Sequence, residues 1–182
     1  MKTEVTSVHN PKLTTLKRWV RVITAVTATA LLVLIVWEVY QVYQLSTDKM
    51  FAESYMPYQM ESSVTDSLTS IEYHFQSKAY KEVIKESKRV FSVNDKEKLL
   101  VGLSYFETKQ YLPAISWLKR LITSDNPYRQ TAEYYLALAH LKNEDYDRAM
   151  ELMEVMIKDN KHPYHDKFTN QMIKDLRLIK WK

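Results

Sequence analysis

The sequence contains no cysteine, one glycine and five prolines among its 182 residues. Without cysteine the chain has no disulfides, thiolate zinc sites, iron–sulfur clusters or cysteine nucleophile. A single glycine excludes the P-loop and the dinucleotide-binding fingerprint, because both need several glycines close together. Lys, Glu, Leu, Met and Tyr are plentiful, which favours helices over a turn-rich β fold. The composition therefore predicts an all-α protein.

The basic charge is concentrated at the start of the chain. The formal net charge is +4, and residues 1–21 alone carry this excess, whereas the remaining residues hold equal numbers of basic and acidic side chains. A nucleic-acid-binding protein usually carries a basic surface on its folded part. We therefore expect no nucleic-acid partner.

An uncharged apolar run covers residues 22–37, and the apolar stretch from Trp19 to Tyr43 is long enough to cross a bilayer core of ~30 Å. Aromatic rings of the type found at membrane interfaces lie near both ends. A buried soluble helix would show a polar face, a surface helix would show a charged stripe, and a cleaved signal peptide would have small residues after the apolar core. The sequence shows none of these, so it predicts one transmembrane helix at residues 19–43.

The charges that flank this span predict its orientation. Cationic residues precede the span, and mainly acidic residues follow it: Lys12, Lys17, Arg18 and Arg21 before, and Glu38, Asp48, Lys49 and Glu53 after. The positive-inside rule then places residues 1–18 in the cytoplasm as a short tail. We expect a single-pass protein of the cytoplasmic (inner) membrane, with its C-terminal part on the extracytoplasmic, periplasmic side.

Residues 44–66 form a juxtamembrane linker in which Pro57 prevents a continuous helix. This linker also contains a dense apolar and aromatic cluster, which is not typical of a free tether: Met50, Phe51, Tyr55, Met56, Tyr58 and Met60. Two interpretations stay open. The cluster packs on the first repeat of its own chain, or it contacts a membrane partner.

An internal repeat begins after the linker. Three pairs of residues are each 35 positions apart: Tyr111 and Tyr146, Ala114 and Ala149, and Gly102 and Ala137. Equal offsets with apolar residues at helical spacing indicate two helices per unit and a solenoid. We expect helical hairpins at 67–78 with 80–91, at 96–109 with 112–124, and at 130–143 with 146–159. The repeat domain then covers residues 67–163.

Two stretches, LLVGLSYFETKQYLPAISWL and YYLALAHLKNEDYDRAMELM, resemble tetratricopeptide repeats. In that family small residues let the paired helices approach closely, and aromatic residues occupy set positions. The resemblance assigns these structural roles to Gly102, Tyr105, Tyr111, Ala114, Ala137, Tyr146 and Ala149. The closing prolines, Pro127 and Pro163, fall one and two places late, and His140 stands at an aromatic position. The first unit is degenerate.

The final segment, residues 164–182, places apolar residues on one helical stripe: Phe168, Met172, Leu176 and Ile179. A solenoid has to cover its last apolar face, so this segment is expected to be a capping helix, with partner binding as the alternative.

The tetratricopeptide resemblance implies that the first helix of each pair lines a concave surface that binds partner proteins. That surface would consist of Lys96, Leu99, Leu103, Phe106, Thr131, Tyr134, Leu138 and Leu141. This lining is mostly apolar and suits an apolar or helical segment of another protein. The alternative is that the groove is filled by the cap or by the aromatic cluster of the same chain.

The sequence offers little for catalysis. His162, His165 and Asp166 could in principle bind a metal, but histidines in a loop are expected to face solvent. The carboxylates have the spacing of helix surfaces, and no catalytic triad signature is present. We therefore assign no catalytic, cofactor or metal residues and expect neither an enzyme nor a small-molecule substrate.

The overall plan is similar to that of bacterial single-pass membrane-anchored tetratricopeptide proteins, some of which attend the secretion translocon or envelope assembly. This resemblance implies a non-catalytic scaffold or adaptor that helps to assemble or tether an envelope complex. Two alternatives stay open. The cytoplasmic tail contacts a transcription or signalling factor, or the span packs into a larger membrane complex as an accessory subunit through its small residues at Thr24, Thr27, Ala28 and Ala30.

Overall fold

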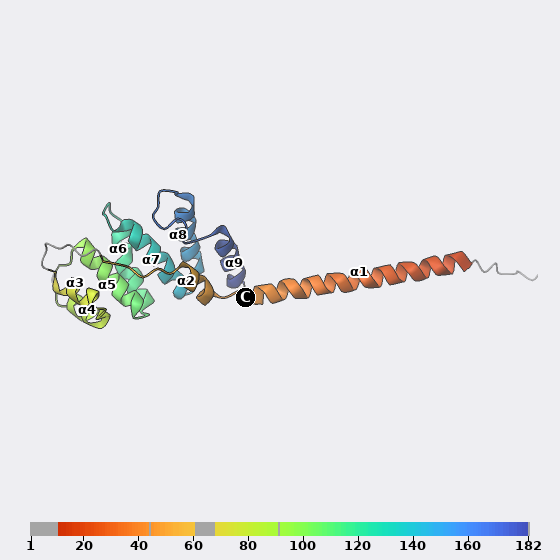
Figure 1. Cartoon of the computed structure of the whole chain (residues 1–182), viewed down its shortest axis with the longest axis horizontal. Helices are drawn as coiled ribbons and strands as arrows, with labels where there is room; N and C mark the ends of the chain where they lie inside the picture. The colour runs from red at the N-terminus through yellow and green to blue at the C-terminus, as the bar shows by residue number, and fades with distance from the viewer. Residues whose placement is uncertain (1–10, 44, 61–67, 91, 182) are drawn as a thin grey trace, which may run out of the picture. The chain divides into compact units, whose positions relative to one another are not determined.

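The computed structural model describes residues 11–43, 45–60, 68–90 and 92–181 (Figure 1). Within these ranges every regular element is an α-helix, as the composition predicts. The chain divides into two compact units, Met1–Gln44 and Leu45–Lys182. Residues 1–10 of the expected cytoplasmic tail, residues 44 and 61–66 of the expected linker and residue 67 at the start of the expected repeat domain lie outside the described residues.

The first unit contains α1, a single helix over Pro11–Tyr43. Its segment Trp19–Tyr40 has a mean hydropathy of 2.2, and none of the side chains described in this segment is buried. Two of its threonine side chains are satisfied inside the helix, since the Thr24 hydroxyl donates to the Arg21 carbonyl at 2.9 Å and the Thr27 hydroxyl donates to the Thr24 carbonyl at 3.0 Å. This helix is long and apolar enough to span a membrane.

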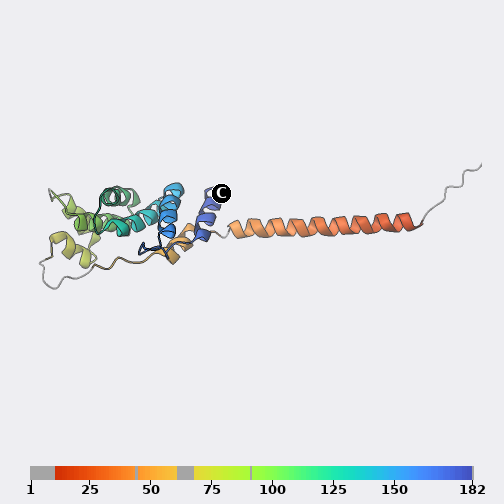
Figure 2. The same ribbon diagram turned by 90° about the horizontal axis from the view of Figure 1, so that it is seen from above.

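The second unit contains the other helices. In chain order they are α2 (Thr47–Ser54), α3 (Ser70–Gln76), α4 (Tyr80–Ser87), α5 (Asp95–Glu107), α6 (Tyr111–Ile122), α7 (Arg129–Lys142), α8 (Tyr146–Lys158) and α9 (Asn170–Lys180). Helices α3 to α8 form three consecutive hairpins, and α9 packs on α8 at the end of the series (Figures 1 and 2). The predicted fold class, three hairpins with a terminal helix, is confirmed. Helix α2 was not predicted.

Local sequence explains where the helices begin. A capping box starts α3, in which the Thr69 and Glu72 side chains each accept a hydrogen bond from the other residue's backbone amide. Asn94 and Glu97 form the same arrangement at the start of α5. Each capping box satisfies two backbone donors that the first helical turn leaves unpaired, so these helix starts are set by the local sequence.

The turns inside the three hairpins share one backbone feature. Lys78, Lys109 and Glu144 have φ angles of 56°, 60° and 60°, in the left-handed region that usually favours glycine. Lys109 and Glu144 are 35 residues apart, so the turn conformation repeats with the sequence period. Each turn therefore includes one residue in an unfavourable backbone conformation, and the packing of the two helices that it joins offsets this small free-energy cost.

The helices of the second hairpin approach each other closely at Gly102. A methyl group there would lie 2.9 Å from Leu118 Cδ2 and 3.0 Å from Leu118 Cγ, so it would push the buried Leu118 side chain aside. Ala114, Ala137 and Ala149 are completely buried where neighbouring helices pack. Small residues therefore lie at the closest approaches between helices.

His140 occupies a buried position on α7. Its side chain is 4 % exposed, and Nδ1 lies 2.9 Å from the Asp145 carboxylate in the turn before α8. Burial lowers the pKa of the His140 imidazole, and Asp145 only partly opposes this shift. The ring is therefore held neutral in the folded protein down to a lower pH than in the unfolded chain.

We expect His140 to weaken the fold as the pH falls. Its pKa in the unfolded chain is about 6.5, so the unfolded state takes up a proton first and stability decreases as the pH drops through about 6.5. A His140→Gln variant should show a smaller loss of stability than the unsubstituted protein between about pH 7.5 and 5.5. Urea unfolding followed by circular dichroism measures this difference, and an equal loss in both proteins would contradict the prediction.

Candidate protein-binding groove

Residues 45–60, which we name the strap, lie along the first helices of the hairpins. The strap consists of α2 followed by an extended stretch, residues 55–60, and it runs from α7 past α5 toward α3 (Figures 1 and 2). Helix α2 ends before Pro57, as expected from the helix-breaking effect of proline. The strap therefore lies in the groove formed by α3, α5 and α7.

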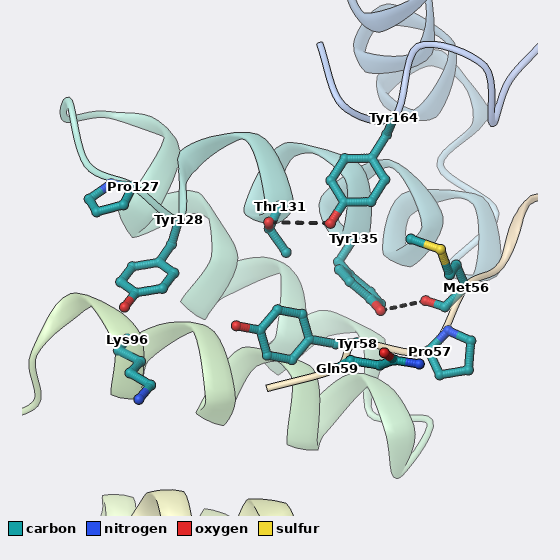
Figure 3. Close-up of a pocket in the computed structure, with 10 residues that line it drawn as sticks. All are labelled: Met56, Pro57, Tyr58, Gln59, Lys96, Pro127, Tyr128, Thr131, Tyr135 and Tyr164. Atoms are coloured by element: carbon teal, nitrogen blue, oxygen red, sulfur yellow. Dashed lines mark hydrogen bonds between the residues drawn. The ribbon is translucent and has the colours of Figure 1, made fainter. Parts of the chain in front are cut away.

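Two adjacent tyrosines of α7 hold the main chain of the strap. The Tyr134 hydroxyl donates to the Ser54 carbonyl at 2.5 Å and accepts from the Met56 amide at 2.9 Å. The Tyr135 hydroxyl donates to the Met56 carbonyl at 2.6 Å (Figure 3). Burial raises the pKa of Tyr134 to about 12 and raises that of Tyr135 further, so both hydroxyls keep their protons at neutral pH.

Aromatic side chains hold the helical part of the strap. Phe51 and Tyr55 stack on each other with ring centroids 5.1 Å apart. Both rings contact Phe106 of α5, whose centroid lies 6.0 Å from that of Phe51 and 6.2 Å from that of Tyr55. The Tyr55 hydroxyl also donates to the Glu107 carboxylate at 2.7 Å. Burial, followed by this hydrogen bond, raises the pKa of Tyr55. These contacts join α2 to the C-terminal end of α5.

The two ends of the strap reach different hairpins. Near its start, Asp48 forms an ion pair with Lys142 at 2.6 Å, and this contact lowers the pKa of the Asp48 carboxyl. Near its end, Tyr58 makes an edge contact with Phe75 of α3, with ring centroids 6.1 Å apart. The aromatic cluster thus packs on its own chain. It contacts the first hairpin, as one of the two interpretations had it, and it contacts the second and third hairpins as well.

Four of the predicted concave residues are placed beside the strap: Phe106 and Tyr134 contact it, and Lys96 and Thr131 line the pocket next to it. That Leu99, Leu103, Leu138 and Leu141 line the same groove stays a prediction. Six of the predicted concave residues are buried: Leu99, Leu103, Phe106, Tyr134, Leu138 and Leu141. The other two, Lys96 and Thr131, are partly exposed. Their role in binding a partner stays a prediction, but the strap and the neighbouring helices cover most of them. A partner reaches Tyr134 and Phe106 only when the strap leaves.

Lys96 is held at the edge of the groove by a salt bridge of 2.6 Å to Glu72. Burial alone would raise the pKa of Glu72, but the hydrogen bonds from Lys96 and the Thr69 amide, with the charge of Lys96, lower it overall. Because the pair links α5 to α3, it joins the first two hairpins at the edge of the groove.

A pocket of about 790 Å³ remains open beside the strap (Figure 3). The strap forms one wall of the pocket. The other walls come from α5, from α7, and from the segments before α7 and after α8. The pocket is lined by Met56, Pro57, Tyr58, Gln59, Lys96, Pro127, Tyr128, Thr131, Tyr135 and Tyr164. The Thr131 and Tyr164 hydroxyls lie 3.3 Å apart across its rim. The walls are rich in tyrosine and proline, with Lys96 as the one charged residue among those lining it.

Sequence reasoning missed several residues of this site. Tyr164, expected to begin the cap, stacks on Tyr134 with ring centroids 4.2 Å apart and lines the pocket. Tyr135 and Tyr128 were not assigned either. The spacing of Phe51 and Tyr55, four residues apart, was a usable signal for α2, because such a pair shares one face of a helix.

The histidines near Pro163 differ from expectation. His162 is buried, which corrects the expectation that both loop histidines face solvent. Its Nε2 lies 3.3 Å from Glu133 Oε2 without the geometry of a hydrogen bond, while its Nδ1 accepts from the Tyr164 amide at 3.3 Å. Among the residues that the structure describes, no three His, Asp or Glu side chains are grouped to hold a metal.

A protein-family model described as anaphase-promoting complex, cyclosome, subunit 3 matches residues 107–165, about a third of the chain. This is a tetratricopeptide-like repeat family, and the match extends from the end of α5 through α8. The second unit is a tetratricopeptide-like solenoid. No curated protein and no solved structure gives a significant match to the chain.

Proposed function

We propose that the protein is a non-catalytic, membrane-anchored scaffold that binds other proteins through its tetratricopeptide-like solenoid. One observation carries this proposal: the groove of the solenoid already holds a peptide segment, the strap, through main-chain hydrogen bonds from Tyr134 and Tyr135. A surface that binds an extended main chain in this way has the chemistry of a peptide-binding site. Helix α1 supplies a candidate anchor.

The charge distribution supports the finer parts of the proposal. The basic residues 1–21 favour a cytoplasmic tail, residues 1–18, and an extracytoplasmic solenoid. In this arrangement residues 19–43 anchor the protein, and residues 44–66 connect this anchor to the repeat domain. Residues 67–163 form the repeats, and residues 164–182 cap the last one. The scaffold then helps to assemble or tether a complex of the bacterial envelope.

The orientation is tested with single cysteines, because the chain has none of its own. We expect Ser124→Cys, an exposed position after α6, to react with a membrane-impermeant maleimide in intact spheroplasts. Thr3→Cys, in the tail, should react only after lysis. The reverse pattern would overturn the proposed side of the membrane but leave the anchor intact. Equal labelling of both before lysis would overturn the single-pass topology.

Binding is tested by cross-linking the full-length protein in its membrane and identifying the captured proteins. Thr131→Arg places a long side chain into the pocket, whereas Thr123→Arg makes the same change at an exposed site outside it. We expect a specific protein partner to be captured by the unsubstituted protein and by Thr123→Arg, and to be lost with Thr131→Arg. Equal capture by both variants would contradict a role for the groove, and no specific capture would contradict the scaffold function.

A further inference from the structure

We infer that the strap is an exchangeable ligand of the groove, and that the partner displaces it with a segment of the same chemistry. That segment is a short helix with two aromatic residues four positions apart, followed by an extended stretch that contains a proline. This inference rests on the proposed function as a protein scaffold and specifies the class of partner segment that the scaffold binds.

The strap lies on a stack of helices that is held together without it. The contacts between α5 and α6, α6 and α7, and α7 and α8 are made by the hairpins themselves. In the strap only Met50 and Ser54 are buried, and Met56 is 41 % exposed, whereas Phe106 and Tyr134, which the strap contacts, are buried in the solenoid. The strap is therefore a layer added to a complete solenoid, and its departure leaves the interhelical contacts in place.

The contacts of the strap define what the groove recognises. The hydroxyls of Tyr134 and Tyr135 form hydrogen bonds with main-chain atoms of Ser54 and Met56, and any extended segment supplies the same carbonyl and amide groups. Selectivity comes from the side chains, since the paired rings of Phe51 and Tyr55 meet Phe106. Phe51 lies in α2 and Tyr55 is the residue that directly follows the helix, and their rings stack on each other, so a partner needs the same four-residue spacing.

The proline fixes the conformation that follows the helix. The residue before a proline is pushed into extended backbone, and this is the part of the strap that Tyr134 and Tyr135 hold at Met56. A partner segment with a proline after its second aromatic residue is already shaped for these hydrogen bonds. It therefore loses less conformational entropy on binding than a flexible segment does.

The open pocket gives a partner its point of entry. Residues 56–59 of the strap form one wall, and Tyr135, which holds the Met56 carbonyl, lines the same pocket (Figure 3). A segment that enters the pocket lies next to the hydrogen bond that holds the strap in place. Exchange then proceeds from this end toward α2.

A tethered strap competes strongly with any free peptide. Its effective concentration at the groove is on the order of millimolar, because the strap belongs to the same chain as the groove. Weakening the strap in place should therefore increase the affinity for a peptide added in solution. This linked competition provides a direct test.

The probe is a fluorescent synthetic peptide with the sequence of residues 46–60, titrated into full-length protein in detergent and followed by anisotropy. The strap is weakened by Phe51→Ala with Tyr55→Ala. The matched control is Lys49→Ala with Glu53→Ala, two exposed positions on the same helix. We expect the aromatic variant to bind the peptide at least about tenfold more tightly than the control does. A tenfold change in affinity is what the loss of one pair of ring contacts from the strap would produce. A peptide with both aromatics replaced by alanine should not bind.

A second arm locks the strap and does not depend on the aromatic variant remaining folded. Asp48→Cys with Lys142→Cys replaces an ion pair on the surface, and a short bismaleimide then bridges the two thiols. The bridged protein should bind the peptide more weakly than the same variant capped by a monofunctional maleimide.

Equal peptide binding by the aromatic variant and its control, or by the bridged and capped proteins, would overturn the inference. Because no cellular partner takes part, its failure is distinct from that of the proposed function. Peptide exchange without a cross-linked partner would count against the scaffold alone. A captured partner without peptide exchange would count against the exchangeable strap alone.

Discussion

Replacing Leu138 with alanine is expected to lower the free energy of unfolding by about 3 kcal/mol, within the range of roughly 2–5 kcal/mol observed for buried leucines. Leu138 is completely buried on α7 and belongs to the hydrophobic core of the solenoid. Removing the branched end of its side chain leaves a cavity that the surrounding helices, fixed by their own hairpins, cannot fill.

The matched control for this prediction is Leu112→Ala, because Leu112 is 66 % exposed on α6. This change should alter stability by no more than about 0.5 kcal/mol. Chemical unfolding of the full-length protein in detergent, followed by circular dichroism, measures both variants. Equal stability of the two would show that α7 is not packed as the structure has it. Substitutions at buried positions such as Leu138 are expected to destabilise the fold. Partner binding is therefore better tested at Thr131, which is partly exposed.

Placing two arginines in α1 is expected to abolish stable membrane association. Ala30→Arg and Leu34→Arg lie one helical turn apart in the middle of the Trp19–Tyr40 segment. Each arginine at the centre of a span costs about 2.5–3.5 kcal/mol on insertion scales, and the pair removes most of the favourable transfer of the apolar residues. The protein should then be released from membranes by alkaline carbonate.

The control exchanges the two residues, Ala30→Leu with Leu34→Ala, and keeps the composition of the span unchanged. This variant should resist carbonate extraction as the unsubstituted protein does. If the arginine variant stays in the membrane pellet, α1 is not what anchors the protein. If both variants are released, the membrane association depends on the packing of α1 rather than on its apolar character.

The sequence by itself determined the elements that depend on local patterns. The 35-residue offset of Tyr111 and Tyr146 predicted the hairpins, because each repeat uses the same helix–turn–helix unit. The scarcity of glycine and the apolar run at 22–37 likewise predicted a helical chain with one candidate span. Helix ends were predicted to within a few residues, since capping residues and turns act over short distances.

Only the tertiary structure decided what covers the groove. Tyr134 and Ser54 are 80 residues apart, and no local pattern relates their positions. The sequence indicated that the aromatic cluster at 50–60 packs on another surface, but it left open whether that surface belongs to the same chain or to a membrane partner. The surface on which the cluster packs depended on tyrosine hydroxyls, which form hydrogen bonds with specific main-chain atoms of the strap.

The same reason explains why the burial of His162, which lies near Glu133 of α7, was not predicted. Periodicity identifies which face of a helix is apolar, whereas the partner of that face depends on how separate elements fit together in three dimensions.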